Sequence, residues 1–502
     1  MEIVLGPPGT GKTTYLLEQM EGELDRGTSP KRIGYVSFTK RAAREAKDRA
    51  QVKFKLGHKD LPWVSTLHSL CFRALGMKNE EVFEGKKLQE FAAYCGHKLS
   101  NTVSWEDGSM FGFEIGDRCL FMDNLARVRC VNLREQYDHV ENRDDTPWPV
   151  VDFISQGLVK FKDTYGLKDY TDMLGMFVTL GNVPLDVLFV DEAQDLSMLQ
   201  WRVVEKLAKG TRRVCVAGDD DQAIYRWAGA AVEHFIGLHG TVTVLDHSWR
   251  VPPEVQDIAL KIVAGIKHRR AKAWNPRDGH GVVERVAVLD NADIDINEDT
   301  LILSRNTQFL TGKVIPMLKR QGILYEYHDR PSVRPSLVNA IVLWERLRKG
   351  GEVTVDDAEK IYDEMSSGIG YVRGHKKLPA WQERDQLVTL QDLKEAGGLL
   401  VDTLWREALT RIKPEEQAYM VKVLQGGQKL TERSKIRIST MHGAKGAQAD
   451  HVIILTDMAW RSLEEMKFLP DDEARTWYVA VTRAKQKLTI VAPQNYLRRY
   501  NL

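Results

Sequence analysis

A glycine-rich segment near the N-terminus has the residue types and the spacing needed to hold phosphate groups. Residues 6–13 read Gly-Pro-Pro-Gly-Thr-Gly-Lys-Thr, which matches the pattern GxxxxGK[ST]. The short, mostly apolar run at residues 2–5 (Glu-Ile-Val-Leu) predicts a strand before this segment, and the residues from Thr14 onward predict a helix after it. Glycines let backbone N–H groups surround phosphate oxygens, and a helix N-terminus adds a positive dipole end. The segment therefore predicts a nucleotide phosphate site.

Two side chains of this loop would act directly on the phosphates and on a metal ion. Lys12 would place its positive charge on the β- and γ-phosphates, and the Thr13 hydroxyl would be a ligand of Mg²⁺. The other expected nucleotide contacts are Gly6, Pro7, Pro8, Gly9, Thr10, Gly11 and Thr14.

Acidic residues follow two further apolar runs. Residues 185–190 are mostly apolar and end in Asp191-Glu192, where Asp191 would hold Mg²⁺ and Glu192 would orient and deprotonate a water. Residues 213–217 lead into three aspartates and Gln222. Because ligands bind at the carboxyl ends of strands in an open α/β sheet, these segments predict Mg²⁺-dependent hydrolysis of a nucleoside triphosphate.

The order of short segments along the chain resembles that of the UvrD/Rep type of superfamily 1 DNA helicases. The matching segments are residues 6–13, 37–43, 65–69, 169–174, 191–195, 218–230, 245–250, 303–306, 439–446 and 472–484. The resemblance implies an ATP- and Mg²⁺-dependent motor that translocates on single-stranded DNA from 3′ to 5′ and unwinds duplex. A 5′-to-3′ or RNA-directed motor, and a nucleotide-gated clamp that does not unwind, stay open as alternatives.

The resemblance also implies a fold class, which is α/β with two RecA-like domains. Each would contain a parallel sheet flanked by helices, each would carry a mainly helical inserted subdomain, and ATP would lie between them. The expected division is residues 1–75 plus 165–250 for motor domain 1A, 76–164 for insertion 1B, 251–330 plus 433–502 for motor domain 2A, and 331–432 for insertion 2B.

Positions in these segments carry further expected roles in catalysis. By the resemblance, Gln222 senses the γ-phosphate, and Arg250 and Arg483 are arginine fingers that stabilise charge on the transferring phosphoryl group.

Three residues are expected around the base and the sugar of the nucleotide. Trp249 stands where the family has a tyrosine, and its ring could stack on the base. Gly446 and Gln448 stand near the family's ribose contact, where Gln448 replaces an acid. The family's adenine-reading glutamine precedes the phosphate loop and has no counterpart before Gly6, which leaves nucleotide selectivity open.

The resemblance further implies a track for single-stranded DNA. Stacking requires aromatic faces, and phosphate contacts require hydrogen-bond donors. The candidates are Phe38, Tyr225 and Trp227 for stacking, and Thr39, Thr66, His68, Thr440 and His442 as donors. The expected partners are single-stranded DNA and junctions of single- and double-stranded DNA, with accessory replication or repair proteins as a further class. We expect the protein to act as a monomer.

The composition limits how nucleic acid can be bound. The chain of 502 residues has 71 basic and 70 acidic side chains, which excludes a globally basic binder and favours a local groove. Its apolar runs are shorter than the roughly 20 residues of a membrane span, and its N-terminus lacks a signal-peptide pattern, so we expect a cytoplasmic protein without membrane contact.

Two other features of the sequence are interpreted as having no functional role. The five cysteines are expected to be free thiols, although a metal site made by Cys71, Cys95, Cys119 and Cys130 stays open. The basic, turn-rich stretch at residues 268–279 is interpreted as a solvated loop.

Overall fold

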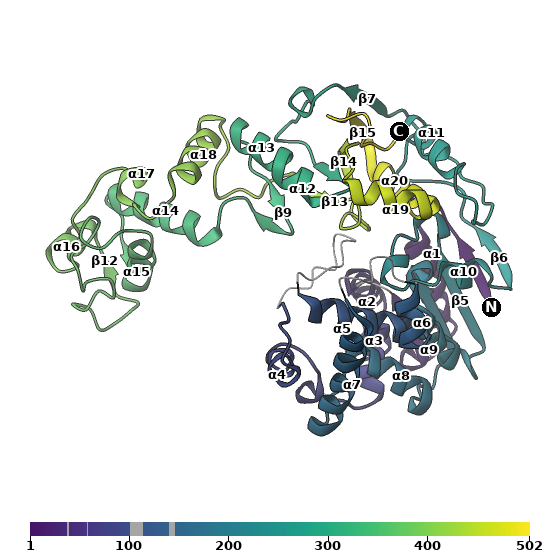
Figure 1. Cartoon of the computed structure of the whole chain (residues 1–502). Coiled ribbons are helices and arrows are strands. Elements are labelled where there is room, and N and C mark those ends of the chain that lie inside the picture. The colour runs from purple at the N-terminus through teal and green to yellow at the C-terminus, as the bar shows by residue number, and fades with distance from the viewer. Residues whose placement is uncertain (38–39, 58, 101–113, 140–145) are drawn as a thin grey trace.

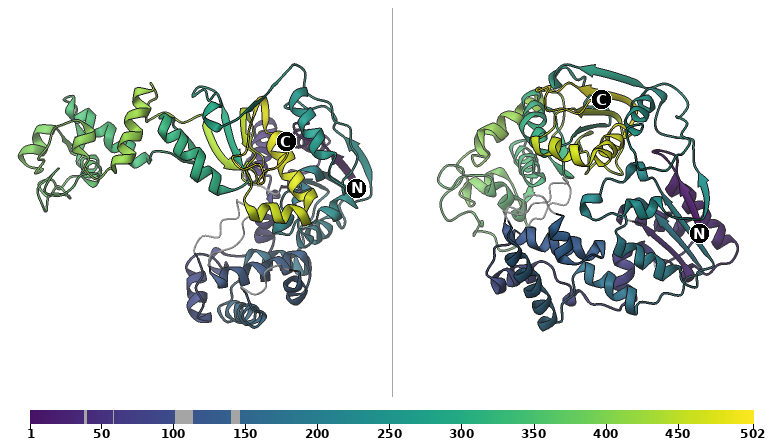
Figure 2. Two further views of the ribbon diagram at one scale, coloured as in Figure 1. Left: turned by 45° about the horizontal axis from the view of Figure 1, so that its top comes forward. Right: turned by 45° about the vertical axis from the view of Figure 1, so that its right-hand side comes forward.

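Two α/β lobes lie side by side, and each carries a helical extension (Figure 1). The computed structural model describes residues 1–37, 40–57, 59–100, 114–139 and 146–502. The chain passes from the first lobe to the second between β6 and α11, which lie on the same side of the molecule (Figure 1), and Figure 2 gives two further views of the lobes. The fold class expected from the sequence, two RecA-like lobes with helical insertions, is confirmed.

The sheet of the first lobe is parallel throughout its described strands. Its strands lie in the order β3 (Val64–Thr66), β2 (Ile33–Ser37), β4 (Val187–Asp191), β5 (Arg213–Gly218), β1 (Glu2–Leu5) and β6 (Thr241–Val244). Leu188 and Val190 of β4 join one buried cluster, whereas Val187 and Phe189 join another. This alternation shows that both faces of the sheet are covered, which explains why the strand is apolar at nearly every position.

Helices cover both faces of this first sheet. They are α1 (Lys12–Asp25), α2 (Lys40–Phe54), α3 (Leu67–Ala74), α8 (Tyr170–Leu180), α9 (Met198–Ala208) and α10 (Val232–Ile236). A separate helical group has its own core, in which Phe91 and Phe161 pack with ring centroids 5.5 Å apart. Its helices are α4 (Lys86–Cys95), α5 (Ile115–Arg129), α6 (Leu133–Asp138) and α7 (Trp148–Tyr165).

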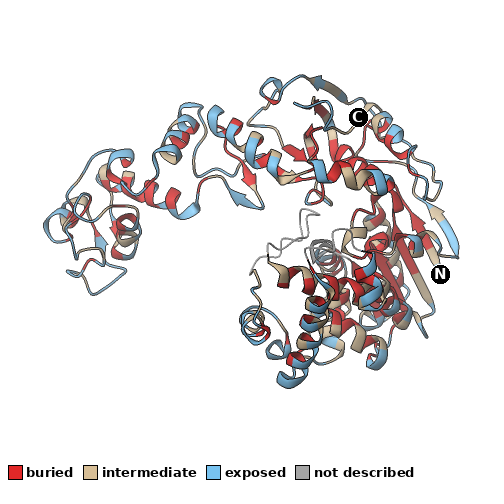
Figure 3. Ribbon diagram, viewed as in Figure 1, coloured by how far each residue is buried: buried red, intermediate tan, exposed pale blue. Residues whose placement is uncertain are grey.

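The sheet of the second lobe is parallel except for a short hairpin at one edge. Its strands lie in the order β10 (Arg330–Pro331), β9 (Glu326–Tyr327), β13 (Ile436–Thr440), β8 (Thr300–Ser304), β14 (Ala449–Leu455), β15 (Ala484–Val491) and β7 (Val282–Val286). The helices around it are α11 (Pro253–Val263), α12 (Thr307–Phe309), α13 (Ile315–Gln321), α19 (Trp460–Phe468) and α20 (Pro470–Val481). Figure 3 shows that the central strands of both sheets are buried.

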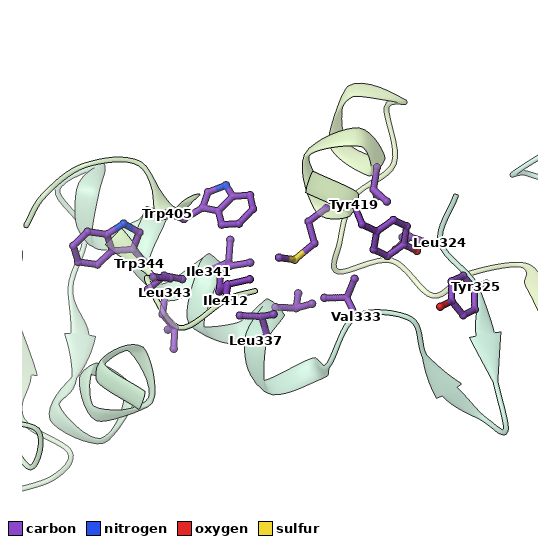
Figure 4. Close-up of a cluster of buried hydrophobic side chains, with 14 of the residues drawn as sticks. Leu324, Tyr325, Val333, Leu337, Ile341, Leu343, Trp344, Trp405, Ile412 and Tyr419 are labelled. Atoms are coloured by element: carbon purple, nitrogen blue, oxygen red, sulfur yellow. The ribbon is translucent and has the colours of Figure 1, made fainter. Parts of the chain in front are cut away.

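A helical arm projects from the second lobe, away from both sheets (Figures 1 and 2). It contains α14 (Pro335–Arg348), β11 (Val353–Thr354), α15 (Val355–Asp363), β12 (Leu387–Val388), α16 (Leu390–Glu395), α17 (Trp405–Ala408) and α18 (Pro414–Gln425). Buried side chains run without a break from Ile302 in the sheet to Trp405 in the arm. Figure 4 shows part of this cluster, including Leu337 and Tyr419 at the root of the arm. The arm is therefore packed onto the lobe and is not joined by a bare linker.

None of the helices in the described part of the chain is long and apolar enough to cross a membrane.

Candidate nucleotide and nucleic-acid site

The phosphate loop joins β1 to α1 at the carboxyl edge of the first sheet. Gly9 and Gly11 have φ angles of 80° and 81°, a left-handed conformation that glycine adopts without steric cost. A Cβ at Gly9 would lie 2.6 Å from the Cβ of Arg250, so only glycine fits where the loop meets the crossover between the lobes. Nζ of Lys12 donates a hydrogen bond to the carbonyl of Gly6 at 2.7 Å. This contact holds the lysine across the loop.

Thr13 and Asp191, the two expected metal ligands, face each other. The Thr13 hydroxyl donates to Oδ2 of Asp191 at 2.8 Å, and the Tyr35 hydroxyl donates to the same oxygen at 2.9 Å. Burial, together with the charge of Glu192, raises the pKa of Asp191 to about 6. A hydroxyl and a carboxylate that are close enough to share one ligand are hard oxygen donors of the kind Mg²⁺ prefers. The pair therefore fits the metal that the fold implies.

Glu192 lies directly after Asp191 in a strained backbone conformation, with φ at 53°. Nε2 of Gln194 donates to Oε2 of Glu192 at 2.5 Å. Burial opposes ionisation of this carboxyl, but the positive charges of Lys12 and Lys445 hold its pKa below the ordinary value. Glu192 is therefore a carboxylate near neutral pH and can accept a hydrogen bond from a water.

Gln222 is the point at which the second lobe contacts this catalytic edge. Nη2 of Arg483 donates to its side-chain Oε1 at 3.1 Å, and Nζ of Lys445 donates to its backbone carbonyl at 2.6 Å. Lys445 also forms an ion pair with Asp195 at 2.6 Å. Burial and the nearby charge of Arg250 lower the pKa of Arg483 to about 9. Two cations from the second lobe are thus held against the first.

Arg250 differs from these cations because two of its guanidinium nitrogens have no partner within the described part of the chain. Its Nε and Nη1 atoms are buried, and they have no hydrogen-bond partner among the described residues. Burial lowers the pKa of Arg250, although the charge of Glu192 opposes the shift. Buried donors are normally satisfied, so this guanidinium next to the phosphate loop is consistent with a site for an anion.

The residues expected near the base and sugar lie on the surface. Trp249 is 75% exposed, and its ring contacts His247 edge-on at 4.6 Å. Its backbone N–H donates to the carbonyl of Gly9 at 2.8 Å. Its position beside the loop favours a stacking role over core packing. Gly446 and Gln448 are exposed before β14, and among the described residues no hydrogen bond joins them to the phosphate loop.

Three of the expected nucleic-acid contacts form one aromatic group between the lobes. The Trp227 ring lies 6.2 Å from both Tyr225 and His442, edge-on in each case. Nε1 of Trp227 and Nδ1 of His442 are buried without a hydrogen-bond partner among the described residues. Burial lowers the pKa of His442 well below its ordinary value, so its imidazole is neutral. The group combines π-faces with unsatisfied polar atoms.

The remaining expected contacts are distributed over both lobes. Thr66 caps the N-terminus of α3 by accepting a hydrogen bond from the Ser69 N–H at 3.3 Å, and His68 packs edge-on against Tyr170 at 6.0 Å. Both residues line a cavity of about 1240 Å³ that Tyr225 also borders. In the second lobe, Oγ1 of Thr440 accepts from the Gly443 N–H at 3.1 Å. Phe38 and Thr39 lie outside the described residues.

Several contacts at this edge were not expected from the sequence. Tyr35 is a strand residue whose type suggests only core packing, and Gln194 lies in the acidic segment without a distinguishing mark. Lys445 belongs to one of the matching segments, and that position was the available signal. All three are recognised only when the strands bring Asp191, Glu192 and Asp195 together.

The structure also bears on the cysteines and on the basic stretch at residues 268–279. The five cysteines are free, and the described residues contain no group of three or more His, Cys, Asp or Glu side chains suited to a metal. The interpretation of residues 268–279 as a solvated loop is wrong at its centre. The side chain of Lys272 is only 1% exposed and pairs with Asp219, Asp220 and Asp221, because these buried carboxylates need a counter-charge.

Comparisons with known proteins agree with this arrangement. Residues 2–242 match the UvrD/REP helicase N-terminal domain, and residues 354–495 match the UvrD-like helicase C-terminal domain. The chain is 22% identical over 395 residues to the ATP-dependent DNA helicase PcrA of Staphylococcus aureus, covering 74% of this chain and 51% of that protein. It is 22% identical over 310 residues to PcrA of Staphylococcus epidermidis, covering 58% and 42%.

The chain thus spans about half the length of the curated relatives it matches. Among solved structures, the crystal structure of Arterivirus nonstructural protein 10 (helicase) matches with a TM-score of 0.34 and 11% identity. That match covers 98% of this chain and 59% of the other.

Proposed function

The chain belongs to the UvrD/Rep-like superfamily 1 helicases, and we propose that it is an ATP-dependent translocase on single-stranded DNA that unwinds duplex. The observation that carries the proposal is that side chains from both lobes lie together at the carboxyl edge of the first sheet. Lys12, Asp191 and Glu192 come from the first lobe, and Arg483 reaches Gln222 from the second. Residues 1–75 plus 165–250 and residues 251–330 plus 433–502 would be the motor domains, with residues 76–164 and 331–432 as their insertions.

The proposed chemistry is hydrolysis of the bond between the β- and γ-phosphates of ATP. Mg²⁺, when bound, supplies positive charge on the phosphate oxygens, and Thr13 and Asp191 would hold it. Lys12 would neutralise the same phosphates, and Glu192 would orient the attacking water and accept its proton. Arg250 and Arg483 would stabilise the charge that develops on the transferring group.

The proposed DNA track is the aromatic group of Tyr225, Trp227 and His442, continued by Thr66, His68 and Thr440. Lys445 supports a coupling between ATP hydrolysis and DNA binding, because it contacts both the aromatic group and the catalytic edge. Its Nζ lies 5.0 Å from the ring centroid of Tyr225 and donates to the carbonyl of Gln222. Movement of the lobes during hydrolysis would therefore shift the stacking surface. We propose 3′-to-5′ polarity and action as a monomer, on the strength of the resemblance.

The test is an ATPase assay followed by an unwinding assay. We expect single-stranded DNA to stimulate hydrolysis several-fold and RNA to stimulate it little, and we expect unwinding of a duplex with a 3′ single-stranded tail. Activity only with a 5′ tail, or only with RNA, would overturn the polarity or the substrate. Hydrolysis that DNA leaves unchanged would favour the clamp.

A further inference from the structure

The segment between α11 and β7 returns from the second lobe to the first. It begins at the second lobe, where the N–H groups of Lys267 and His268 donate to Oδ2 of Asp471 at 3.1 and 3.0 Å. It ends at the crossover, where the Asn275 carbonyl accepts from the Ser248 N–H at 2.9 Å. We call residues 267–275 the strap. Between its ends, the strap crosses the three aspartates that precede Gln222.

The centre of the strap supplies the counter-charge for these aspartates. Nζ of Lys272 lies 3.0 Å from Asp219, 2.6 Å from Asp220 and 2.8 Å from Asp221. Arg269 adds a two-pronged ion pair to Asp221, at 2.8 and 2.6 Å. Burial would depress the pKa of Lys272, but the three carboxylates raise it above the ordinary value. The lysine is therefore charged although its side chain is only 1% exposed.

Asp219 connects this buried charge cluster to the catalytic edge. Its Oδ1 faces Lys272, whereas its Oδ2 accepts a hydrogen bond from Nε2 of Gln222 at 2.7 Å. The other end of the Gln222 amide accepts from Arg483 at 3.1 Å. A carboxylate on one side and a guanidinium on the other fix which end of the amide is oxygen and which is nitrogen. One amide hydrogen is left to reach a phosphate or a water.

Asp219 also fixes the residue that would orient the water. Its backbone N–H donates to Oε1 of Gln194 at 3.0 Å, and Nε2 of the same glutamine donates to Glu192 at 2.5 Å. A displacement of Asp219 would therefore disturb Gln222 and Glu192 together. Lys272 touches neither of these residues in the described contacts, so it acts only through the aspartate.

We propose that Lys272 is a positioning residue for hydrolysis. Through Asp219, this lysine sets the orientation of the Gln222 side chain. Because Lys272 belongs to the second lobe, that orientation depends on where the second lobe lies. The proposal rests on the function proposed above. Loss of a partner that orients a metal-binding side chain typically costs about 10–100-fold in activity, and we expect a loss of that order for the orientation of Gln222. The effect should fall on kcat, because Lys272 does not contact the nucleotide-binding residues directly.

The test compares Lys272→Met with Gln222→Ala and with the double variant. We expect Lys272→Met to lower kcat at least tenfold while changing the Kd for a fluorescent ATP analogue less than about threefold. We expect Lys272→Met to lower kcat by a clearly smaller factor in the Gln222→Ala background than in wild type, because the part of its effect that passes through Gln222 is already absent there. An equal loss of kcat in both backgrounds would overturn the proposal.

A matched control separates positioning from folding. Lys313 forms an ion pair with buried Asp457 at 2.9 Å, elsewhere in the second lobe. We expect Lys313→Met to lower the unfolding temperature and to leave kcat unchanged. If Lys272→Met behaves in the same way, the lysine is structural and the proposal is wrong.

A second variant keeps the test valid if Lys272→Met folds poorly. Adding Asp220→Asn removes one of the unpaired buried charges and should restore stability, since Asp220 contacts Lys272 and the Arg270 N–H but not Gln222. We expect this double variant to fold and to remain at least tenfold slow in kcat. Recovery of wild-type kcat would overturn the proposal, whereas a wild-type protein that hydrolyses no ATP would overturn the proposed function together with it.

Discussion

Nη2 of Arg483 in the second lobe donates a hydrogen bond to Oε1 of Gln222 in the first lobe, over a distance of 3.1 Å. The two residues are 261 positions apart in the chain, so only the packing of the lobes brings them together. Both are expected to act on the γ-phosphate, and here they bind each other. A phosphate that enters between the two side chains would accept hydrogen bonds from donors that are already oriented. Nucleotide binding would thereby be coupled to the distance between the lobes.

Replacement of Lys12 should abolish hydrolysis. Lys12→Ala removes the charge that the β- and γ-phosphates require, and we expect ATP turnover to fall to background, with or without DNA. The matched control is Lys53→Ala, because Lys53 forms an exposed ion pair with Glu21 on the surface. Steady-state ATPase rates of the two variants give the answer, and substantial turnover by Lys12→Ala would contradict the role of the loop.

Replacement of Arg250 should separate activity from stability. An arginine finger contributes about 10³-fold or more to phosphoryl transfer, so Arg250→Met should lower kcat on that order. Because its Nε and Nη1 are buried without partners among the described residues, its loss should leave the nucleotide-free protein as stable or more stable. Thermal unfolding and kcat are measured together, with exposed Arg320→Met as the control. A large loss of stability would show that Arg250 is structural.

Replacement of Trp227 should uncouple DNA from hydrolysis. Trp227→Ala removes a stacking surface that is worth about 1–3 kcal/mol per base, and it leaves the phosphate loop intact. We expect basal ATPase to persist and DNA stimulation to disappear. Phe153→Ala is the aromatic control, since Phe153 is exposed on α7 in the helical group of the first lobe. Stimulation that survives unchanged in Trp227→Ala would rule out the stacking role.

Replacement of Trp249 should weaken nucleotide binding without harming the fold. The ring is 75% exposed, so its removal costs little packing. If it stacks on the base, its loss should remove about 1 kcal/mol of binding free energy, which raises KM for ATP about fivefold at unchanged kcat. The comparison of ATP, GTP and a ring-free triphosphate in wild type and Trp249→Ala measures the contribution of the base. An unchanged KM for all three would place the base elsewhere.

His451 should make the protein sensitive to acid. It is fully buried in β14, where Nε2 contacts Oγ1 of Thr489 at 2.8 Å, and burial lowers its pKa to about 4. The folded state therefore resists protonation, whereas the unfolded chain takes up a proton below about pH 6.5. Stability should be fully present above pH 6.5 and should fall as the pH drops toward 4, by up to about 1.4 kcal/mol per pH unit from this residue.

Denaturant unfolding at several pH values measures that slope. We expect His451→Gln to have a flatter acid dependence than wild type, whatever its absolute stability. If the slope of His451→Gln matches that of wild type, other groups determine the acid response.

Local patterns in the sequence were sufficient for the phosphate loop and its strand. The mostly apolar runs at residues 2–5, 185–190 and 213–217 correspond to β1, β4 and β5, because a strand buried on both faces is apolar at most positions. The acids that follow β4 then had to meet the loop at one sheet edge. The strap is the opposite case. Its basic composition resembles that of a surface loop, and only the packing shows that its charges neutralise buried acids.

The sequence by itself determined the type of chemistry and the order of the segments that carry it. The physical reason is local: the phosphate loop needs glycines, a buried strand needs apolar residues, and a metal site at the sheet edge needs acids at the strand ends. The tertiary structure alone decided which charges are paired and which are left free. Lys272 and Arg483 are held by partners from the other lobe, whereas two buried donors of Arg250 beside the phosphate loop have no partner among the residues that the structure describes. Which charged side chains pair with each other depends on which distant segments pack together, and the residue types and their spacing along the chain do not reveal this packing.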